Sequence, residues 1–227
     1  MDTIEQLKRD VIGASRILSQ QKLVEGFGHV SARIADSDRF IITPRISLAL
    51  VQESELLIMN ANGEVAEGKH AAPIEALLHA AIMKAKPRVN AITRIHARVA
   101  NIFSVTERKL EPVHSHGSFF AGGVPVYAKP DLILTAKLGS EVAQVLDDKP
   151  AVLLRGNGQV TVGRTIPEAV MMAIYLEEAA QILFGALQIG TPIPLTMDES
   201  KQRQVEALTP ADMERAWNFF KSKIAND

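Results

Sequence analysis

The sequence predicts an α/β fold in which a mixed β-sheet is layered with helices. Segments with the period of a half-buried strand alternate with segments of helical period. Several neighbouring strand candidates are joined by hairpin turns rather than by helices, so a doubly wound parallel sheet is not expected. A dinucleotide-binding loop is not expected either, because Gly26-Phe27-Gly28 lacks a third glycine and precedes a strand.

Six segments carry helical periodicity or helix-start signals. In the first, Val11 and Leu18 fall on one face. In the fourth, Leu132 and Leu134 are expected to face the core, and the fifth opens at Thr165 with a capping-box pattern. We expect helices over residues 3–22, 74–85, 97–105, 131–147 and 165–186, and another that starts near residue 209.

Strand candidates are short runs of β-branched and apolar residues bounded by turn residues. Pro44 ends the second of them, and the turn at residues 60–63 indicates that the third enters a hairpin. The last two flank the turn Gly156-Asn157-Gly158. We expect strands over residues 30–34, 39–43, 56–59, 91–95, 152–154 and 160–162.

Neither a repeat nor a Pro/Gly/Ser-rich linker divides the chain. The prediction is one domain over residues 1–227, with a C-terminal helical extension over about residues 196–227. A chain of this length buries enough surface to form a core without disulfides or a structural metal.

Composition excludes several classes of function. The chain has no Cys, which excludes disulfides, thiolate nucleophiles, zinc fingers and iron–sulfur clusters. Lys and Arg number 25 against 26 Asp and Glu, so the basic face of a nucleic-acid-binding protein is not expected. We find no run of about 18 apolar residues that would span a bilayer, and the acidic, mixed N-terminus is unlike a signal peptide. The expected location is the cytoplasm.

Two loops could bind an anionic substrate. His29 and Ser31 follow paired glycines, which allow a backbone to approach a ligand closely. Arg45 and Ser47 follow the second strand, where an arginine suits a carboxylate or a phosphate. Taken singly, each loop could equally be an ordinary turn or a solvated surface segment.

Three further groups carry potential acid, base or ligand side chains. Glu75 and His79 are spaced four residues apart on the same helical face, as in acid–base or metal pairs, and also as in ordinary surface pairs. Arg94 and His96 lie at a strand end, where a structural role is the alternative. The His-x-His spacing in His114-Ser115-His116 recurs among metal ligands, but it is short.

In this order, the segments resemble the class II aldolase/adducin family from about residue 5 to residue 195. No single motif is specific, and the assignment rests on six in register. The landmarks are Gly28-His29-Val30-Ser31, Ile42-Thr43-Pro44, Glu75, the stretch 87–92 leading to His96, Ala121-Gly122-Gly123-Val124-Pro125, and Leu153-Leu154-Arg155-Gly156-Asn157-Gly158. The resemblance implies a three-layer α/β/α fold and a homotetramer with sites at subunit interfaces.

The resemblance also implies a set of site residues. The family's sugar-phosphate aldolases hold Zn²⁺ with three histidines and use a glutamate as acid and base. Glu75 falls on that glutamate and His96 on the second histidine, whereas Arg94 and Asn157 fall on the first and third. Arginine stays protonated and cannot ligate, so His96 and Asn157 would hold Zn²⁺ or Mn²⁺ only weakly. We hypothesise that Arg94 takes the place of the metal.

The leading hypothesis is a lyase, either a decarboxylase or a retro-aldol enzyme, acting on a small hydroxy, oxo or aromatic carboxylate through an enolate-like intermediate. The residues at Arg45 and around Glu75 fit a sugar phosphate poorly, and Gly-Phe-Gly-His-Val-Ser looks like the family's decarboxylase branch. Glu75, Arg94 and His116 are the expected catalytic residues; His116, or alternatively His114, falls near the family's acid tyrosine and would protonate the carbanion. The expected substrate-binding residues are His29, Ser31, Arg45, Ser47 and His114.

Two alternatives stay open. Loss of two imidazole ligands also suits a non-catalytic, adducin-like association module. The same arginine and histidine groups would equally serve a metal-free isomerase, dehydratase or cyclase, because fold does not fix function.

Overall fold

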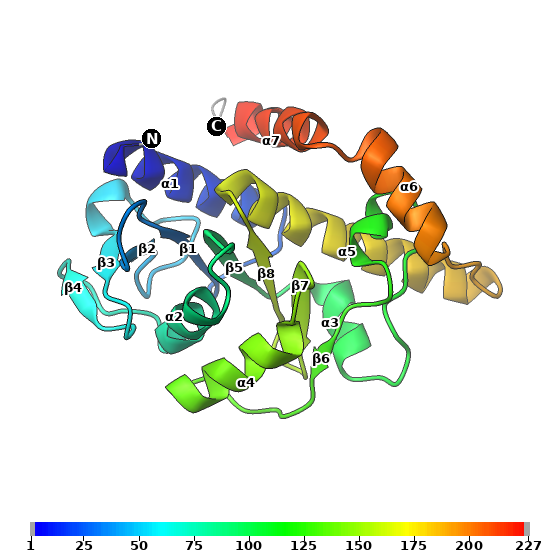
Figure 1. The fold of residues 1–227 in the computed structure, drawn as a ribbon, viewed down its shortest axis with the longest axis horizontal. Coiled ribbons are helices and arrows are strands. Elements are labelled where there is room, and N and C mark those ends of the chain that lie inside the picture. Colours follow the sequence, from blue (N-terminus) through cyan, green and yellow to red (C-terminus); the bar gives the residue numbers. More distant parts are fainter. Residues whose placement is uncertain (1–2, 225–227) are drawn as a thin grey trace.

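The computed structural model describes residues 3–224 and shows one eight-stranded sheet between two layers of helices (Figure 1). The strand order is β4-β3-β2-β1-β5-β8-β7-β6. The strands are β1 (His29–Arg33), β2 (Phe40–Ile42), β3 (Leu57–Met59), β4 (Val65–Glu67), β5 (Ala91–Ile95), β6 (Val126–Tyr127), β7 (Ala151–Leu154) and β8 (Gln159–Gly163). Six of the seven strand pairs are antiparallel and β6–β7 is parallel, so the predicted mixed α/β sheet is confirmed.

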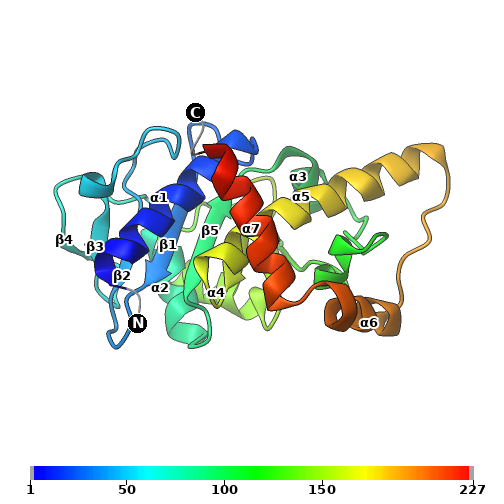
Figure 2. The same cartoon turned by 90° about the horizontal axis from the view of Figure 1, so that it is seen from above.

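The helices divide between the two faces of the sheet. α1 and α5 cover one face together with α3, and α2 and α4 cover the other (Figure 1). Of the two C-terminal helices, α7 lies outside α1 and α5 and packs against both (Figure 2), whereas α6 packs against the 3₁₀ turn η2. The helices are α1 (Ile4–Gln20), α2 (Ala76–Ala85), α3 (Arg98–Ser104), α4 (Ala136–Leu146), α5 (Ile166–Ile189), α6 (Met197–Ala207) and α7 (Pro210–Ile224), with short 3₁₀ turns η1 (Glu53–Glu55) and η2 (His116–Phe120).

The central strand β5 shows how the two cores are built. Ala91 and Ile95 pack on the side of α1 and α5, and Ile92 packs on the side of α2 and α4. Successive side chains of a strand point to opposite faces. Arg94 therefore points to the α2 side, where it interrupts an otherwise apolar layer.

α5 is a core helix, although its length and hydropathy alone would allow it to cross a bilayer. More than half of its most apolar window is buried, against the sheet, α1, α3 and α7. Thr165 caps its N-terminus by accepting a hydrogen bond from the Glu168 amide, as the capping-box pattern predicts. It is the only helix in the described range that passes this test.

The predicted helix over 131–147 is wrong in its first turn. Thr135 caps α4, which begins at Ala136, and the preceding residues are not helical. Leu132 and Leu134, expected in the core, are 48% and 46% exposed. Instead of opening a helix, this irregular segment makes a long-range contact, in which the amide of Ile133 donates a hydrogen bond to Glu75.

The C-terminal extension contains two helices, and sequence periodicity finds only α7. α6 is polar on nearly all sides, so it has little apolar pattern to detect. A capping box between Thr196 and Glu199 stabilises its start. The two-residue strand β6 is also absent from the prediction, because it is too short to show a period.

Candidate functional site

A buried ion pair lies where β5 ends beneath the start of α2. Arg94 Nε donates to Glu75 Oε2 at 3.1 Å, and the two residues are only 1% and 5% exposed. The other guanidinium nitrogens donate to backbone carbonyls, Nη1 to Ile95 at 2.8 Å and Nη2 to Asn157 at 2.5 Å. Glu75 Oε1 accepts from the Ile133 amide. Four segments far apart in sequence therefore meet around one ion pair.

Gly158 makes room for this guanidinium. It has φ +83°, and a Cβ at this position would lie 2.3 Å from the Ile95 carbonyl oxygen and 2.7 Å from Arg94 Nη1. The same Cβ would lie 3.0 Å from His96 Nδ1. Arg94 and His96 thus both lie against the β7–β8 turn, although β5 ends one residue before His96.

Neutral imidazoles surround the guanidinium. Burial first, and then the charges of His79 and Arg94, hold the pKa of His29 well below its usual value. Burial followed by Arg94 lowers the pKa of His79 to about 3, and the same two causes lower the pKa of His96 to about 4. At neutral pH the group therefore contains one cation, one carboxylate and three uncharged rings.

Ser31 and His79 connect β1 to α2. Ser31 Oγ and His79 Nδ1 lie 2.7 Å apart, and both residues are fully buried. The rings of His79 and His29 have their centroids 5.6 Å apart, and His29 pairs with Arg94 across β1 and β5. The structure therefore brings two predicted substrate-binding residues, His29 and Ser31, to the ion pair, together with His79.

Several polar atoms at this site have no partner among the described residues. They are His29 Nδ1, His79 Nε2 and Asn157 Nδ2, all buried. Buried polar atoms are rarely left without a hydrogen bond, and the exceptions concentrate at places where a ligand or water binds. When Ser31 donates to His79 Nδ1, His79 Nε2 carries the proton and can donate to such a ligand.

Arg45 and Ser47 lie in a neighbouring loop. Arg45 is exposed, and Ser47 Oγ donates to the carbonyl of Glu25 in the loop before β1. No contact within residues 3–224 joins either side chain to Arg94. Their proposed role in substrate binding stays a prediction.

His114 and His116 lie on the opposite side of the sheet from the ion pair. Their segment packs with α5, since Val113, Phe119 and Tyr175 belong to the core on that side. His116 stacks on Tyr175 and bonds Glu178 of α5, and His114 lies near the same carboxylate. Proton donation by His116 or His114 at Arg94 therefore stays a prediction.

Sequence reasoning missed Glu178 as a partner of these histidines. It follows Glu177, which accepts hydrogen bonds from the amides of Val99 and Ala100 at the start of α3. The two neighbouring glutamates thus serve different parts of the fold. The available signal was the three-residue spacing from Tyr175 to Glu178, which puts both on one face of α5.

The residues at Arg94 do not fit a divalent cation, which the family resemblance implies. The guanidinium carries a positive charge between Glu75 and Asn157, and Glu75 already accepts two hydrogen bonds. Asn157 directs its backbone oxygen to Arg94, and its amide nitrogen is a donor. His96 is then the one strong ligand left of the predicted pair His96 and Asn157, and one imidazole does not hold such an ion.

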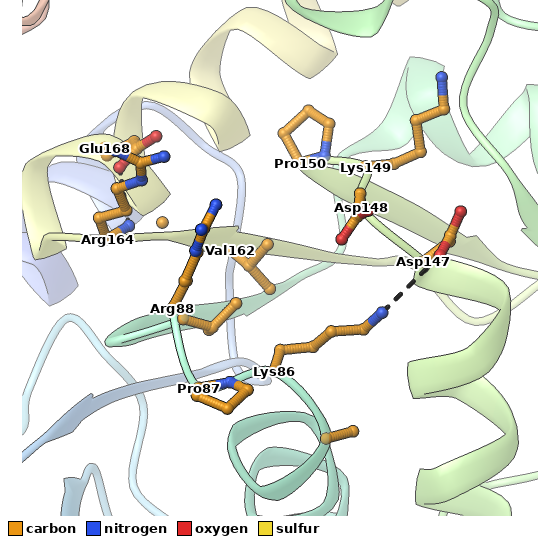
Figure 3. Close-up of a pocket in the computed structure, with 13 residues that line it drawn as sticks. Lys86, Pro87, Arg88, Asp147, Asp148, Lys149, Pro150, Val162, Arg164 and Glu168 are labelled. Atoms are coloured by element: carbon orange, nitrogen blue, oxygen red, sulfur yellow. Dashed lines mark hydrogen bonds and ion pairs between the residues drawn. The ribbon is translucent and has the colours of Figure 1, made fainter.

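A cavity of about 700 Å³ lies elsewhere on the molecule. Val162 and Gly163 line it at the end of β8 opposite to Gly158, and the Lys86–Asp147 ion pair crosses it at 3.9 Å (Figure 3). Its charged residues are of both signs, and it contains none of the histidines. It therefore lacks the chemistry found around Arg94.

Comparison with known proteins agrees with this fold. The family model for the Class II Aldolase and Adducin N-terminal domain matches residues 9–184. A 3,4-dihydroxyphthalate decarboxylase of Rhodococcus jostii (strain RHA1) is 29% identical over 82% of this chain and 83% of its own length. An L-fuculose phosphate aldolase of Escherichia coli (strain K12) is 28% identical over 86% of this chain and 90% of its own.

A solved structure shows the same architecture. The L-fuculose 1-phosphate aldolase from Glaciozyma antarctica PI12 superposes with a TM-score of 0.86 at 24% identity. The match covers 100% of this chain and 92% of that one. The three-layer α/β/α fold expected from the sequence is confirmed.

Proposed function

Because the chain belongs to the class II aldolase and adducin family, we propose that it is a lyase that breaks a carbon–carbon bond in a small carboxylate. Its relatives include a decarboxylase and an aldolase. Both kinds of reaction leave the bonding electron pair on carbon, where it must be stabilised. The substrate class that we propose is a hydroxy, oxo or aromatic carboxylate, with decarboxylation as the favoured reaction.

The observation that carries this proposal is the buried guanidinium of Arg94. Three of its five N–H groups donate to described protein acceptors, which leaves two for a ligand. A preorganised cation in a water-poor site stabilises developing negative charge strongly. In decarboxylation CO₂ leaves, the electron pair delocalises onto a neighbouring oxygen as an enolate, and a proton then adds to carbon. Arg94 would donate hydrogen bonds to that oxygen.

The neighbouring residues have supporting roles in this proposal. Glu75 holds the guanidinium, because both of its oxygens are engaged by the protein. The unpartnered atoms of His29, His79 and Asn157 would bind the substrate carboxylate. The proton donor, for which the sequence suggests His116 or His114, stays a prediction.

The test is release of CO₂ or of an aldehyde from a panel of hydroxy, oxo and aromatic carboxylates. Replacing Arg94 with Met and Glu75 with Gln in the same chain removes both charges, so no unpaired carboxylate stays buried. We expect kcat/KM to fall at least about 100-fold, or about 2.7 kcal/mol of transition-state stabilisation. Arg88→Met, in the exposed loop at the cavity of Figure 3, is the matched control and should keep full activity. Full activity in the double variant would overturn the proposal.

A non-catalytic role has one observation in its favour. Arg94 is almost fully buried, and each of its nitrogens already bonds to the protein, as in a purely structural ion pair. An association module would release no product from any member of the panel. Turnover by the wild-type protein that is lost in the double variant excludes this alternative.

We also propose that the chain forms a homotetramer, as the family resemblance implies. Large apolar side chains are strongly exposed in the isolated chain, and such surface often marks an interface. They include Phe27, Leu50, Ile189, Ile193 and Val205. Light scattering after gel filtration should give four times the chain mass, and a monomer would contradict the proposal.

A further inference from the structure

We propose that His114, His116 and Glu178 form a site for a divalent transition-metal ion of the zinc type, separate from the Arg94 ion pair. The site joins the loop before η2 and η2 itself to the middle of α5. It lies on the α5 side of the sheet, whereas Arg94 lies on the α2 side. The inference is independent of the proposed lyase activity.

The three side chains already approach the spacing of ligands around one ion. One ligand atom from each lies within 4.8 Å of the others. His116 Nδ1 is 2.9 Å from Glu178 Oε2, and His114 Nε2 is 3.8 Å from Glu178 Oε1. Zinc binds imidazole nitrogen and carboxylate oxygen at about 2.0–2.2 Å, so tetrahedral ligand atoms lie roughly 3.3 Å apart. Small side-chain rotations would bring all three to that distance.

His114 supplies the second observation. Both of its ring nitrogens are buried, and neither has a hydrogen-bond partner within the described chain. A buried imidazole with two unbonded nitrogens is costly, and a bound cation would satisfy one of them. Gly117 lets the ring sit there, because a Cβ at 117 would lie 3.1 Å from His114 Nδ1.

The surrounding structure orients the other two ligands. The His116 ring stacks on Tyr175 with centroids 4.3 Å apart, and Phe119 stacks on Tyr175 in turn. Glu178 comes from a long, well-packed helix one turn after Tyr175. Metal sites require neighbouring contacts of this kind, because these contacts fix the orientation of the ligand side chains.

The site also has room for a further ligand. A cavity of about 340 Å³ between α5 and α7 is lined by His116, Tyr175, Glu178 and Arg215. The Arg215 side chain is 82% exposed and pairs with Asp212 at 3.2 Å. Three protein ligands with an open position are typical of exchangeable or catalytic zinc sites, and a small carboxylate is the ligand class that Arg215 would favour.

Metal binding would change the role of His116. Its Nδ1 would bind the metal together with Glu178, so it would not act as the free proton donor expected from the sequence. A zinc-binding measurement can establish this without any activity assay.

The test is titration of metal-free protein with Zn²⁺ by calorimetry, together with the visible spectrum of the Co²⁺-loaded protein. Wild type should bind one ion per chain, with the strong absorption of a low-coordinate Co²⁺ site. His114→Ala and Glu178→Gln should each weaken binding at least about tenfold. Circular dichroism of the metal-free variants checks that they fold. If His114→Ala does not fold, Glu178→Gln still tests the site, because glutamine preserves the shape of the glutamate side chain.

His70→Ala is the matched control. His70 lies 3.9 Å from Glu55 at the surface, but no third ligand joins them among the described residues. This variant should bind Zn²⁺ as wild type does. Equal affinity in wild type and Glu178→Gln, or loss of binding only in His96→Ala, would overturn the assignment.

Discussion

Arg94 and Glu75 form an ion pair at 3.1 Å from which solvent is almost entirely excluded. Removing the charge of one partner leaves the other buried and unpaired, which costs far more than the pair itself contributes. Arg94 also donates a hydrogen bond to the Asn157 carbonyl in the β7–β8 turn. The pair therefore connects the position of α2 to that of the turn.

Removing one charge of this pair should destabilise the protein more than removing both. We expect Arg94→Met to lower the free energy of unfolding by about 3–5 kcal/mol. Adding Glu75→Gln should recover most of that loss. Urea unfolding measures both, and Arg39→Met, which breaks the exposed pair with Glu67, should cost less than about 1 kcal/mol. Equal losses for the single and double variants would contradict a coupled pair.

Adding a methyl group at Gly158 should displace Arg94. The residue has φ +83°, and the new Cβ would meet the Ile95 carbonyl oxygen and the guanidinium. We expect Gly158→Ala to lower thermal stability and to reduce activity together. Gly185→Ala is the control: this exposed position in α5 has open space around it, so the variant should gain about 0.5–1 kcal/mol. A Gly158→Ala variant as stable as wild type would show that the turn can move without cost.

Stability should fall as the pH drops below about 6.5. The unfolded chain protonates its histidines near that value, whereas His79 and His96 take up protons in the fold only near pH 3 and 4. The unfolded state thus binds more protons in this window, and each such histidine costs at most about 1.4 kcal/mol per pH unit. Urea unfolding at pH 7.0, 5.5 and 4.5 measures the slope. His79→Gln should reduce this slope.

The fold was predictable wherever local pattern and tertiary contacts agree. α1, β5 and α5 appear at their expected positions, because a periodic apolar face is also the face that packs. The segment before α4 shows the opposite case. Leu132 and Leu134 suggest a helical face, yet the chain there is irregular and supplies the Ile133 amide to Glu75. The helix α6 lacks any apolar stripe, and only its capping box marks it.

The candidate site was predictable mainly from the order of its motifs. The hydrophobic periodicity predicts that Arg94 lies at a strand end. It does not predict that Glu75 and Asn157 lie close to Arg94; that expectation comes from the family resemblance. Ser31 and His79 are 48 positions apart in the sequence, so no local sequence pattern predicts their contact. Glu178 was missed for a similar reason: it sits in a mostly apolar helix, and its partners come from a distant loop.

Neighbouring glutamates on α5 should respond differently to substitution. Glu177 is buried and accepts hydrogen bonds from the amides of Val99 and Ala100, so it satisfies two of the free donors at the start of α3. Glu178 is half-exposed and contacts His116. We expect Glu177→Ala to cost about 1–2 kcal/mol of unfolding free energy with or without Zn²⁺.

Glu178→Ala should cost less than about 1 kcal/mol in metal-free protein, since its ion pair is partly solvated. It should, however, abolish the rise in melting temperature that Zn²⁺ gives the wild type, because a ligand stabilises only the state that binds it. Glu177→Ala should keep that rise. Thermal unfolding of the three proteins with and without Zn²⁺ separates a glutamate that caps a helix from one that binds an ion. An unchanged zinc response in Glu178→Ala would contradict the proposed site.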